Sequence, residues 1–161
     1  IANVELVSAA IALGKDAALE KTLKAGFGLA MPSATQSSEA GGMRALRLAP
    51  DQVMLMLPDA GVRAAEDVAA KLGHAGYVTL QTDAWMICEV SGPGARSALE
   101  RLCPLDLDPQ AFGPGQFART VMEHMSAVIL RTGADSYVLM SASSSAGSFA
   151  HAVETSLAYT T

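Results

Sequence analysis

The sequence predicts an α+β fold in which two ferredoxin-like halves, each reading strand-helix-strand-strand-helix, share one core. The first observation is that this order of apolar and periodic segments occurs twice along the chain, with a closing strand added to the first half. The second is the length, because 161 residues can bury one good core but are too few for two full-sized domains. We therefore expect a single domain over residues 1–161, with halves at about 1–82 and 83–161.

The first half begins with a strand and a helix. Residues 4–13 are apolar and include β-branched side chains, which favours a strand. In the segment that follows, hydrophobic residues recur at i, i+4 and i+8, the spacing of one helical face: Leu19, Leu23 and Phe27. We expect Gly26 or Gly28 to end this helix in the left-handed conformation.

A loop and a hairpin come next. Residues 31–42 are polar and without periodicity, so we predict a flexible loop there. Residues 43–48 and 53–57 flank Pro50 and Asp51, which suit the centre of a tight turn, and this arrangement predicts a hairpin. Its second strand, VMLML, is apolar on both faces, which indicates burial on both sides or a second face that meets another surface.

A second helix and the closing strand complete the first half. The apolar residues of this helix recur at helical spacing: Ala65, Val68, Ala69 and Leu72. Gly73 is the expected C-cap of the helix, and residues 77–81 then predict a strand.

The second half repeats the order with a long connection after its first helix. Residues 84–90 predict a strand, and Ser91-Gly92-Pro93-Gly94 cannot continue it and forms a turn. Residues 93–102 predict a helix in which Arg96 and Glu100 pair at i, i+4. The segment 103–116, which we call the clasp, has three prolines and little charge.

Three strands and a helix close the chain. The strands are expected at residues 117–122, 127–131 and 137–140. The final helix has its apolar face at Ala146, Phe149, Ala150, Val153 and Leu157. One of the serines at 143–145 is expected to cap its start.

Composition and charge exclude some classes of partner. Half of the residues are hydrophobic and only 17% are charged, so most of the chain is expected to fold, and the low charge hints at a covered surface. The formal net charge is −5 and the charges are scattered, so there is no basic stripe for phosphates or an anionic membrane. We expect no nucleic acid and no membrane as a partner.

The two cysteines indicate a reduced protein. Cys88 lies in a predicted strand and Cys103 precedes a proline, so neither belongs to a CxxC pair or lies near a histidine at zinc-ligand spacing. A cytoplasmic location is the simplest interpretation. The sequence begins with Ile1 rather than Met, which leaves open a piece of chain upstream.

Several polar residues are of types that can take part in catalysis or ligand binding. His74, His124 and His151 lie far apart and in unlike contexts, which favours surface or capping roles over a metal site. The turn at 91–94 lacks the GxSxG, GxGxxG and GxxxxGKS patterns, although a helix start there leaves open a weak anion site. Asp106 and Asp108 have no visible third partner for acid–base work, and capping of turns before Pro109 is the favoured role: we expect no catalytic, cofactor-binding or metal site in this chain.

Without a nucleophile, base and electrophile together, the residues favour a non-catalytic subunit or binding module over an enzyme. The clasp is then the best candidate for a docking surface, because it is long, ordered by prolines and poor in charge. The residues that we expect to contact a partner are Pro104, Leu105, Asp106 and Phe112.

Residues 88–120, CEVSGPGARSALERLCPLDLDPQAFGPGQFART, resemble the signature region of the gamma subunit of heterotetrameric sarcosine oxidase. GFGLAMP at 26–32 and SSSAGSFAHAVE at 143–154 are similar to the same family. LAPDQ at 48–52 also resembles the family, with three departures from its usual residues along the chain: Ala49, Val53 and Ser143.

The resemblance implies a fold similar to the folate-binding domain of the glycine-cleavage T protein. It also implies a small subunit that binds no cofactor itself, while larger flavoprotein subunits of the complex carry FAD, FMN, NAD and tetrahydrofolate. Such a complex oxidises sarcosine to glycine and passes the one-carbon unit to tetrahydrofolate or releases formaldehyde. The alternative is a free-standing folate-binding or aminomethyltransferase-like protein of the T-protein kind.

Overall fold

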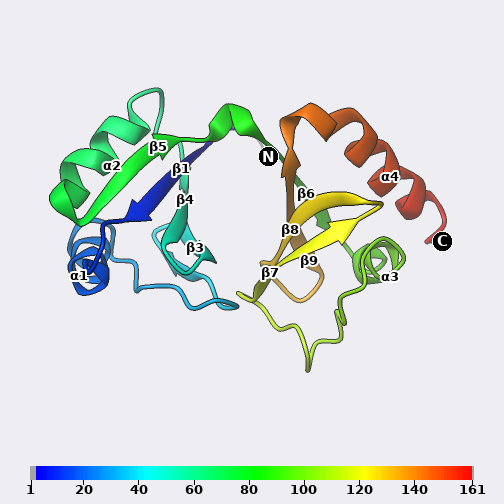
Figure 1. The fold of residues 1–161 in the computed structure, drawn as a ribbon. Coiled ribbons are helices and arrows are strands. Elements are labelled where there is room, and N and C mark those ends of the chain that lie inside the picture. The colour runs from blue at the N-terminus through cyan, green and yellow to red at the C-terminus, as the bar shows by residue number, and fades with distance from the viewer. Residues whose placement is uncertain (1–2, 161) are drawn as a thin grey trace. The chain divides into compact units, whose positions relative to one another are not determined.

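The computed structural model describes residues 3–160, and the chain divides into two compact units with the boundary between Thr82 and Asp83 (Figure 1). Each unit contains a mixed arrangement of helices and one antiparallel sheet. No helix within residues 3–160 combines the length and the apolar character needed to span a membrane.

The N-terminal unit is a five-stranded antiparallel sheet with two helices. Its elements are β1 (Val4–Ile11), α1 (Asp16–Phe27), β2 (Ser38–Ala40), β3 (Met43–Ala49), β4 (Gln52–Pro58), α2 (Ala64–Leu72), the 3₁₀ turn η1 (Gly73–Ala75) and β5 (Gly76–Leu80). The strand order is β2-β3-β4-β1-β5, so the last strand lies beside the first. The short 3₁₀ turn η2 (Thr82–Ala84) leads out of this unit.

The C-terminal unit is a four-stranded antiparallel sheet with two helices. Its elements are β6 (Trp85–Ser91), α3 (Ala95–Glu100), β7 (Phe117–Met122), β8 (Met125–Arg131), β9 (Ser136–Ala142), the 3₁₀ turn η3 (Ser143–Ser145) and α4 (Ala146–Ala158). The strand order is β6-β9-β8-β7. The predicted strands and helices of both halves are therefore present, with small differences in their ends.

The two units share one topology. Reversed, the C-terminal order β7-β8-β9-β6 matches the N-terminal order β2-β3-β4-β1, and β5 is the one strand that the first unit adds. Without the edge strand β2, the first unit has the strand order of a ferredoxin-like fold. The α+β class with a closing strand in the first half is confirmed.

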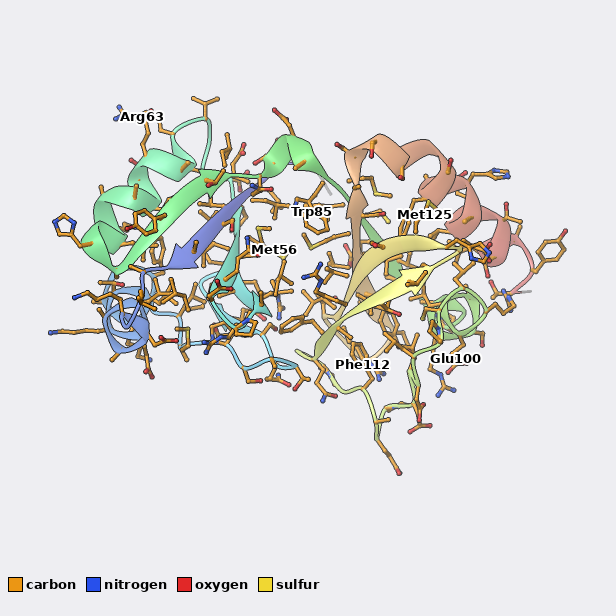
Figure 2. All side chains as sticks on the ribbon, in the orientation of Figure 1. Met56, Arg63, Trp85, Glu100, Phe112 and Met125 are labelled. Carbon is orange, nitrogen blue, oxygen red and sulfur yellow. The ribbon has the colours of Figure 1, made fainter. Side chains whose placement is uncertain are left out.

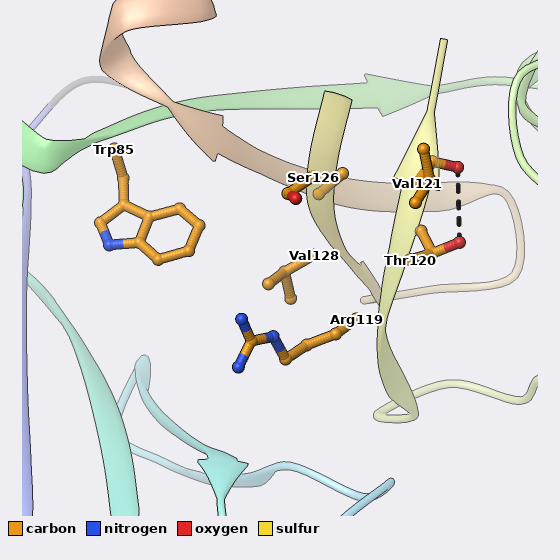
Figure 3. Close-up of a pocket in the computed structure, with 7 residues that line it drawn as sticks. Trp85, Arg119, Thr120, Val121, Ser126 and Val128 are labelled. Carbon is orange, nitrogen blue, oxygen red and sulfur yellow. Dashed lines mark hydrogen bonds between the residues drawn. The ribbon is translucent and has the colours of Figure 1, made fainter. Parts of the chain in front are cut away.

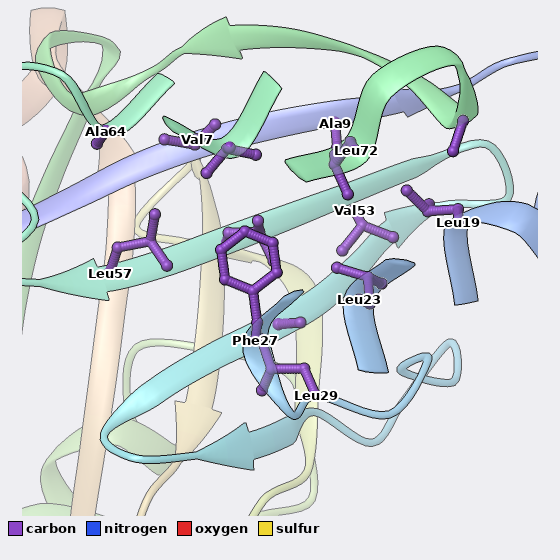
Figure 4. Packing of buried hydrophobic residues seen from close by; sticks show 14 residues of the cluster. Val7, Ala9, Leu19, Leu23, Phe27, Leu29, Val53, Leu57, Ala64 and Leu72 are labelled. Carbon is purple, nitrogen blue, oxygen red and sulfur yellow. The ribbon is translucent and has the colours of Figure 1, made fainter. Parts of the chain in front are cut away.

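Each unit has its own cluster of buried hydrophobic residues between its helices and one face of its sheet. In the N-terminal unit, apolar residues of α1 and α2 pack against β1, β3 and β4 (Figure 4). Members of this cluster include Val7, Leu19, Leu23, Phe27, Val53, Leu55, Val68 and Leu72. In the C-terminal unit the corresponding cluster includes Leu99, Leu107, Ile129, Tyr137, Leu139, Phe149 and Val153.

Part of the opposite face of each sheet is apolar and buried as well. In β4, Met54 and Met56 alternate with the cluster residues and are only 2% and 7% exposed (Figure 2). In the C-terminal sheet, Val128, Leu130 and Met140 occupy the same kind of position and are also buried. The prediction that the VMLML strand is buried on both faces is confirmed.

Three local predictions differ from the structure. The predicted loop 31–42 contains β2, which pairs with β3 and is tied by an ion pair between Glu39 and Arg44. A strand of three residues is too short to show a hydrophobic periodicity, and its pairing with β3 is what stabilises it. The helix predicted at 93–102 covers only Ala95–Glu100, and the serines at 143–145 form η3 without a side-chain cap.

Candidate functional site

The clasp is ordered by turns that its own aspartates stabilise. The Oδ1 atom of Asp106 accepts a hydrogen bond from the main-chain N–H of Asp108 at 2.9 Å. Asp108 repeats this two residues later, since its Oδ1 accepts from the N–H of Gln110 at 2.9 Å. These are Asx turns, in which a short carboxylate replaces a main-chain acceptor. The capping role predicted for the two aspartates is confirmed.

A buried arginine holds the clasp against the sheet. Arg131, at the end of β8, is 3% exposed, and its Nη1 donates to the carbonyl oxygen of Phe112 at 2.6 Å. The same guanidinium donates to the carbonyls of Gly133 and Ala134 in the β8–β9 turn. Its main chain also pairs with the clasp, with Gly115 N–H donating to the Arg131 carbonyl at 2.7 Å. One side chain thus connects the clasp, the turn and β8.

Sequence reasoning did not single out Arg131, although a signal was present. Residues 127, 129 and 131 lie on the same face of β8, so the charged Arg131 shares that face with the buried Ala127 and Ile129. A charge that continues an apolar face must find hydrogen-bond partners, because burial of an unpaired charge is costly. Arg131 satisfies this requirement with carbonyl oxygens rather than with a carboxylate.

The four predicted partner contacts lie in different environments. Pro104 and Asp106 are exposed, and Leu105 is half-buried and packs at the border of the cluster. Phe112 is only 7% exposed and belongs to the core of the unit (Figure 2). The exposed part of the clasp remains a predicted docking surface, whereas the Phe112 ring is part of the hydrophobic core.

The two cysteines are free thiols with little reactivity. Burial raises the pKa of the Cys88 thiol, which is half-buried on β6. Burial also raises the pKa of the Cys103 thiol, and its Sγ lies 3.3 Å from the Leu99 carbonyl oxygen. Because the thiolate is the reactive form, both side chains are poor nucleophiles near neutral pH.

The three histidines lie on three different elements. His74, His124 and His151 are exposed on η1, on the β7–β8 turn and on α4. Within residues 3–160 no group of three His, Cys, Asp or Glu side chains could hold a metal ion. Gly92, at the predicted turn, has φ of +109° and allows the chain to leave β6 for α3.

The C-terminal sheet carries a hollow of about 240 Å³ that follows from its register (Figure 3). Trp85 is paired with Ala142 and Val121 with Ser126, so small side chains lie between larger ones. The large residues belong to the edge strands β6 and β7, and the space between them stays open. Seven residues line the hollow: Trp85, Arg119, Thr120, Val121, Ser126, Ala127 and Val128.

The lining of this hollow offers polar groups but none suited to acid–base chemistry. Its lining offers an indole ring, the guanidinium of Arg119 and the hydroxyl groups of Ser126 and Thr120. None of the seven lining residues is an acid, a histidine or a cysteine, and arginine does not release its proton. Sequence reasoning did not detect this hollow, because the periodicity of one strand carries no information about its register with a neighbouring strand.

A second hollow, of about 380 Å³, lies where α3, the β7–β8 turn and α4 meet. The guanidinium of Arg101 borders it and is fixed by Ser156, whose Oγ accepts from Nε at 3.2 Å. Glu123 closes another side, and its main-chain N–H donates to the Leu102 carbonyl at 3.3 Å. The polar groups of this hollow therefore serve mainly to fasten the hairpin and α4 to α3.

Solved structures with the same fold place the chain in a structural class. Heterotetrameric sarcosine oxidase from Corynebacterium sp. U-96 contains a chain that matches with a TM-score of 0.86 and 21% identity, over 98% of this chain and 81% of that one. The glycine cleavage system aminomethyltransferase T from Bartonella henselae matches with a TM-score of 0.62 and 17% identity, over 95% and 44%. The fold is thus that of T-protein-like domains, as the resemblance implied.

Sequence comparison then gives the family. Residues 12–158 match the model of the sarcosine oxidase, gamma subunit family, and the chain belongs to that family. The sarcosine oxidase subunit gamma of Arthrobacter sp. is 33% identical, and that of Corynebacterium sp. (strain P-1) is 31% identical, each over 115 residues. These matches cover 71% of this chain and 57% of each relative.

Proposed function

We propose that this chain is the gamma subunit of a heterotetrameric, flavin-dependent sarcosine oxidase and binds its larger subunits. The observation that carries the proposal is the family match, which runs over residues 12–158 and so includes both units. The likeness to a chain of a heterotetrameric sarcosine oxidase supports the same role.

The chemistry of the complex is assigned to the other subunits. They carry FAD, FMN, NAD and tetrahydrofolate and oxidise sarcosine to glycine, with the one-carbon unit passed to tetrahydrofolate or released as formaldehyde. The gamma subunit contributes surface rather than reagents, and it works in the cytoplasm. In support, burial raises the pKa of both thiols, and the residues that line the hollow beside Trp85 include no acid, histidine or cysteine.

The clasp is the surface that we propose for docking. Its main chain is held by two Asx turns and by Arg131, so it is ordered before a partner arrives. A preordered surface loses less conformational entropy on binding than a flexible loop. Pro104 and Asp106 are its exposed members among the predicted contacts.

Co-expression tests the proposal directly. The chain is tagged and produced together with the products of its neighbouring reading frames, and the tag is used for purification. We expect a stable complex that contains a larger flavoprotein and oxidises sarcosine. Recovery of the tagged chain alone, although the flavoprotein is present in the lysate, would contradict the proposal.

The alternative of a free-standing folate-binding protein is separated by titration. Tetrahydrofolate is added to the purified chain in a calorimeter, and the unfolding temperature is measured with and without it. The subunit role predicts neither heat nor stabilisation, because a ligand that binds the folded state must raise its stability. Binding by the isolated chain would favour the alternative.

A further inference from the structure

The edge of β6 is incomplete in comparison with its counterpart β1. In the N-terminal sheet β1 lies between β4 and β5, whereas in the C-terminal sheet β6 pairs with β9 alone among residues 3–160. The two ladders correspond residue by residue, since each has seven pairs, the first being Val4 with Pro58 in one and Trp85 with Ala142 in the other. The position beside β6 that β5 occupies beside β1 is not filled by a described strand.

Residues of β1 are more buried than the corresponding residues of β6, as expected when β6 lacks a second neighbouring strand. Val7 and Ser8 of β1 are 0% and 4% exposed, with β5 paired alongside. Their counterparts in the C-terminal unit are Cys88, which is half-buried, and Glu89, which is exposed. Edge strands with unpaired main-chain groups readily accept another strand.

The main-chain groups on this edge point away from β9. Gly92 N–H donates to the Asp135 carbonyl at 2.9 Å, so even-numbered residues of β6 bond to β9 in this antiparallel ladder. Odd-numbered residues therefore direct their N–H and C=O groups outward. Among residues 3–160 no hydrogen bond is made to these groups of Glu89 and Ser91.

The chain connectivity indicates which strand belongs there. β5 directly precedes β6 in the sequence but pairs with β1. In a repeated topology, the equivalent of β5 is a strand that directly precedes β1 and pairs with β6. Leu6 of β1 bonds to Gln81 and Thr82, and Thr82 lies three residues before Trp85 in the sequence.

We propose that the edge of β6 is covered by an extended segment of this same polypeptide, upstream of Ile1, which pairs with it antiparallel. The register follows from β5: Leu80 pairs with Val7 and Gly76 with Ile11, and Trp85 corresponds to Val4. The second to sixth residues upstream of Ile1 then pair with Cys88 through Gly92. The matched chain of the Corynebacterium sp. U-96 oxidase is longer than this sequence, since 98% of this chain covers 81% of that one.

The pairing also predicts the composition of the segment. Its second and fourth residues upstream of Ile1 face Cys88 and Val90 on the helix side of the sheet, where Cys88 and Val90 border or join the buried cluster. These two residues should be apolar, as Leu80 and Val78 are in β5. The third and fifth should tolerate polar side chains.

Hydrogen exchange on the full-length chain tests the pairing. The amides of Glu89 and Ser91 are expected to exchange at least about tenfold more slowly in the full-length chain than in a chain that starts at Ile1. Equal exchange of both amides in the two chains, with the other amides of the sheet protected in each, would overturn the proposal.

A pair of proline variants provides the matched control. In the proposed register the third residue upstream of Ile1 donates its N–H to Glu89, whereas the N–H of the fourth points to solvent. Proline at the third position is expected to abolish the protection of Glu89, and proline at the fourth to leave most of it, because an outward N–H is dispensable. An equal effect of both would exclude this register.

The remaining outcomes identify other occupants and also count against the proposal. Protection of Glu89 that depends on protein concentration would assign the edge to a second copy of the chain. Protection that arises only when the larger subunits are added would assign it to a strand of a partner. The inference rests on the fold alone, so failure to assemble an oxidase would leave it standing.

Discussion

At the scale of single residues, Arg131 links the clasp, the β8–β9 turn and β8. Its charge is buried and forms no ion pair with a carboxylate among residues 3–160, and carbonyl oxygens of Phe112, Gly133 and Ala134 accept its hydrogen bonds. The Tyr137 ring lies 5.5 Å from the guanidinium carbon and adds a favourable aromatic contact. A guanidinium suits this place because it presents several donors in fixed directions.

Replacement of Arg131 by Met should destabilise the protein by about 3 kcal/mol, because buried carbonyls lose their donor and the clasp its anchor. Urea unfolding measures the change. Arg63→Met is the control, since Arg63 pairs with Glu66 in an exposed i, i+3 arrangement and should change stability by less than about 0.5 kcal/mol. Equal stability of the two variants would refute this role of Arg131.

Tyr137 presents the opposite case, a buried polar group that lacks a partner. Its side chain is fully buried, and its hydroxyl is the one buried side-chain polar atom among residues 3–160 without a hydrogen bond. Burial raises the pKa of Tyr137 above its ordinary value of 10.0, against the lowering effect of Arg131. The folded state therefore holds this proton longer than the unfolded state.

Tyr137→Phe should keep or raise the stability at neutral pH, by up to about 1 kcal/mol, because the unpaired hydroxyl is removed. The wild-type unfolding free energy should fall as the pH rises above about 10, where only the unfolded state loses the proton. The variant should show a smaller fall. Parallel pH profiles of the two proteins, measured by urea unfolding, would contradict this expectation.

Among the elements, two hairpins with two-residue turns contrast in their backbone. In the β7–β8 turn Glu123 and His124 have φ of +44° and +66°, which side chains with a Cβ rarely adopt. Hairpin turns of this type are normally made by Asn-Gly. In the β3–β4 turn Pro50 and Asp51 are not among the residues with positive φ, and the ladder shifts register nearby.

Replacing Glu123-His124 with Asn-Gly should stabilise the protein by about 1 kcal/mol, because both residues tolerate the left-handed conformation. The same dipeptide placed at Pro50-Asp51 is the matched control and should not stabilise, since that turn does not need positive φ. Thermal unfolding of both variants gives the comparison. A stabilisation at the control site as large as that at 123–124 would show that the turn conformation is not the cause.

For the whole molecule, the docking surface and the core of the clasp can be separated by mutation. Pro104 is exposed in the clasp and is among the predicted contacts, whereas Ala70 is exposed on α2, outside the clasp. Pro104→Glu should reduce recovery of the larger subunits in co-purification, since a new charge is desolvated at the contact. Ala70→Glu adds a carboxylate outside the proposed docking surface and should have little effect.

The thermal unfolding of both variants must stay close to wild type for the comparison to hold. Phe112→Asp serves as the counterexample, because it places a charge in the core and should lower stability by more than about 3 kcal/mol. Equal co-purification of Pro104→Glu and wild type would remove Pro104 from the docking surface.

The sequence alone determined the elements, the two halves and the α+β class. A short apolar run next to the Pro50-Asp51 turn predicted β4, and apolar residues at i, i+4 and i+8 predicted α1, because these patterns are local to each element. The capping roles of Asp106 and Asp108 were also local, since each carboxylate bonds only two residues ahead. The family signature lay in contiguous residues and was confirmed by comparison.

The tertiary structure decided what depends on residues distant in the sequence. It placed Phe112 in the core, gave Arg131 its carbonyl partners, stabilised β2 by pairing with β3 and formed the hollow beside Trp85. The strand order, which leaves β6 at the edge of its sheet, was likewise decided by the tertiary structure. Each of these features arises from pairing between segments, and the periodicity of one segment carries no information about its neighbour.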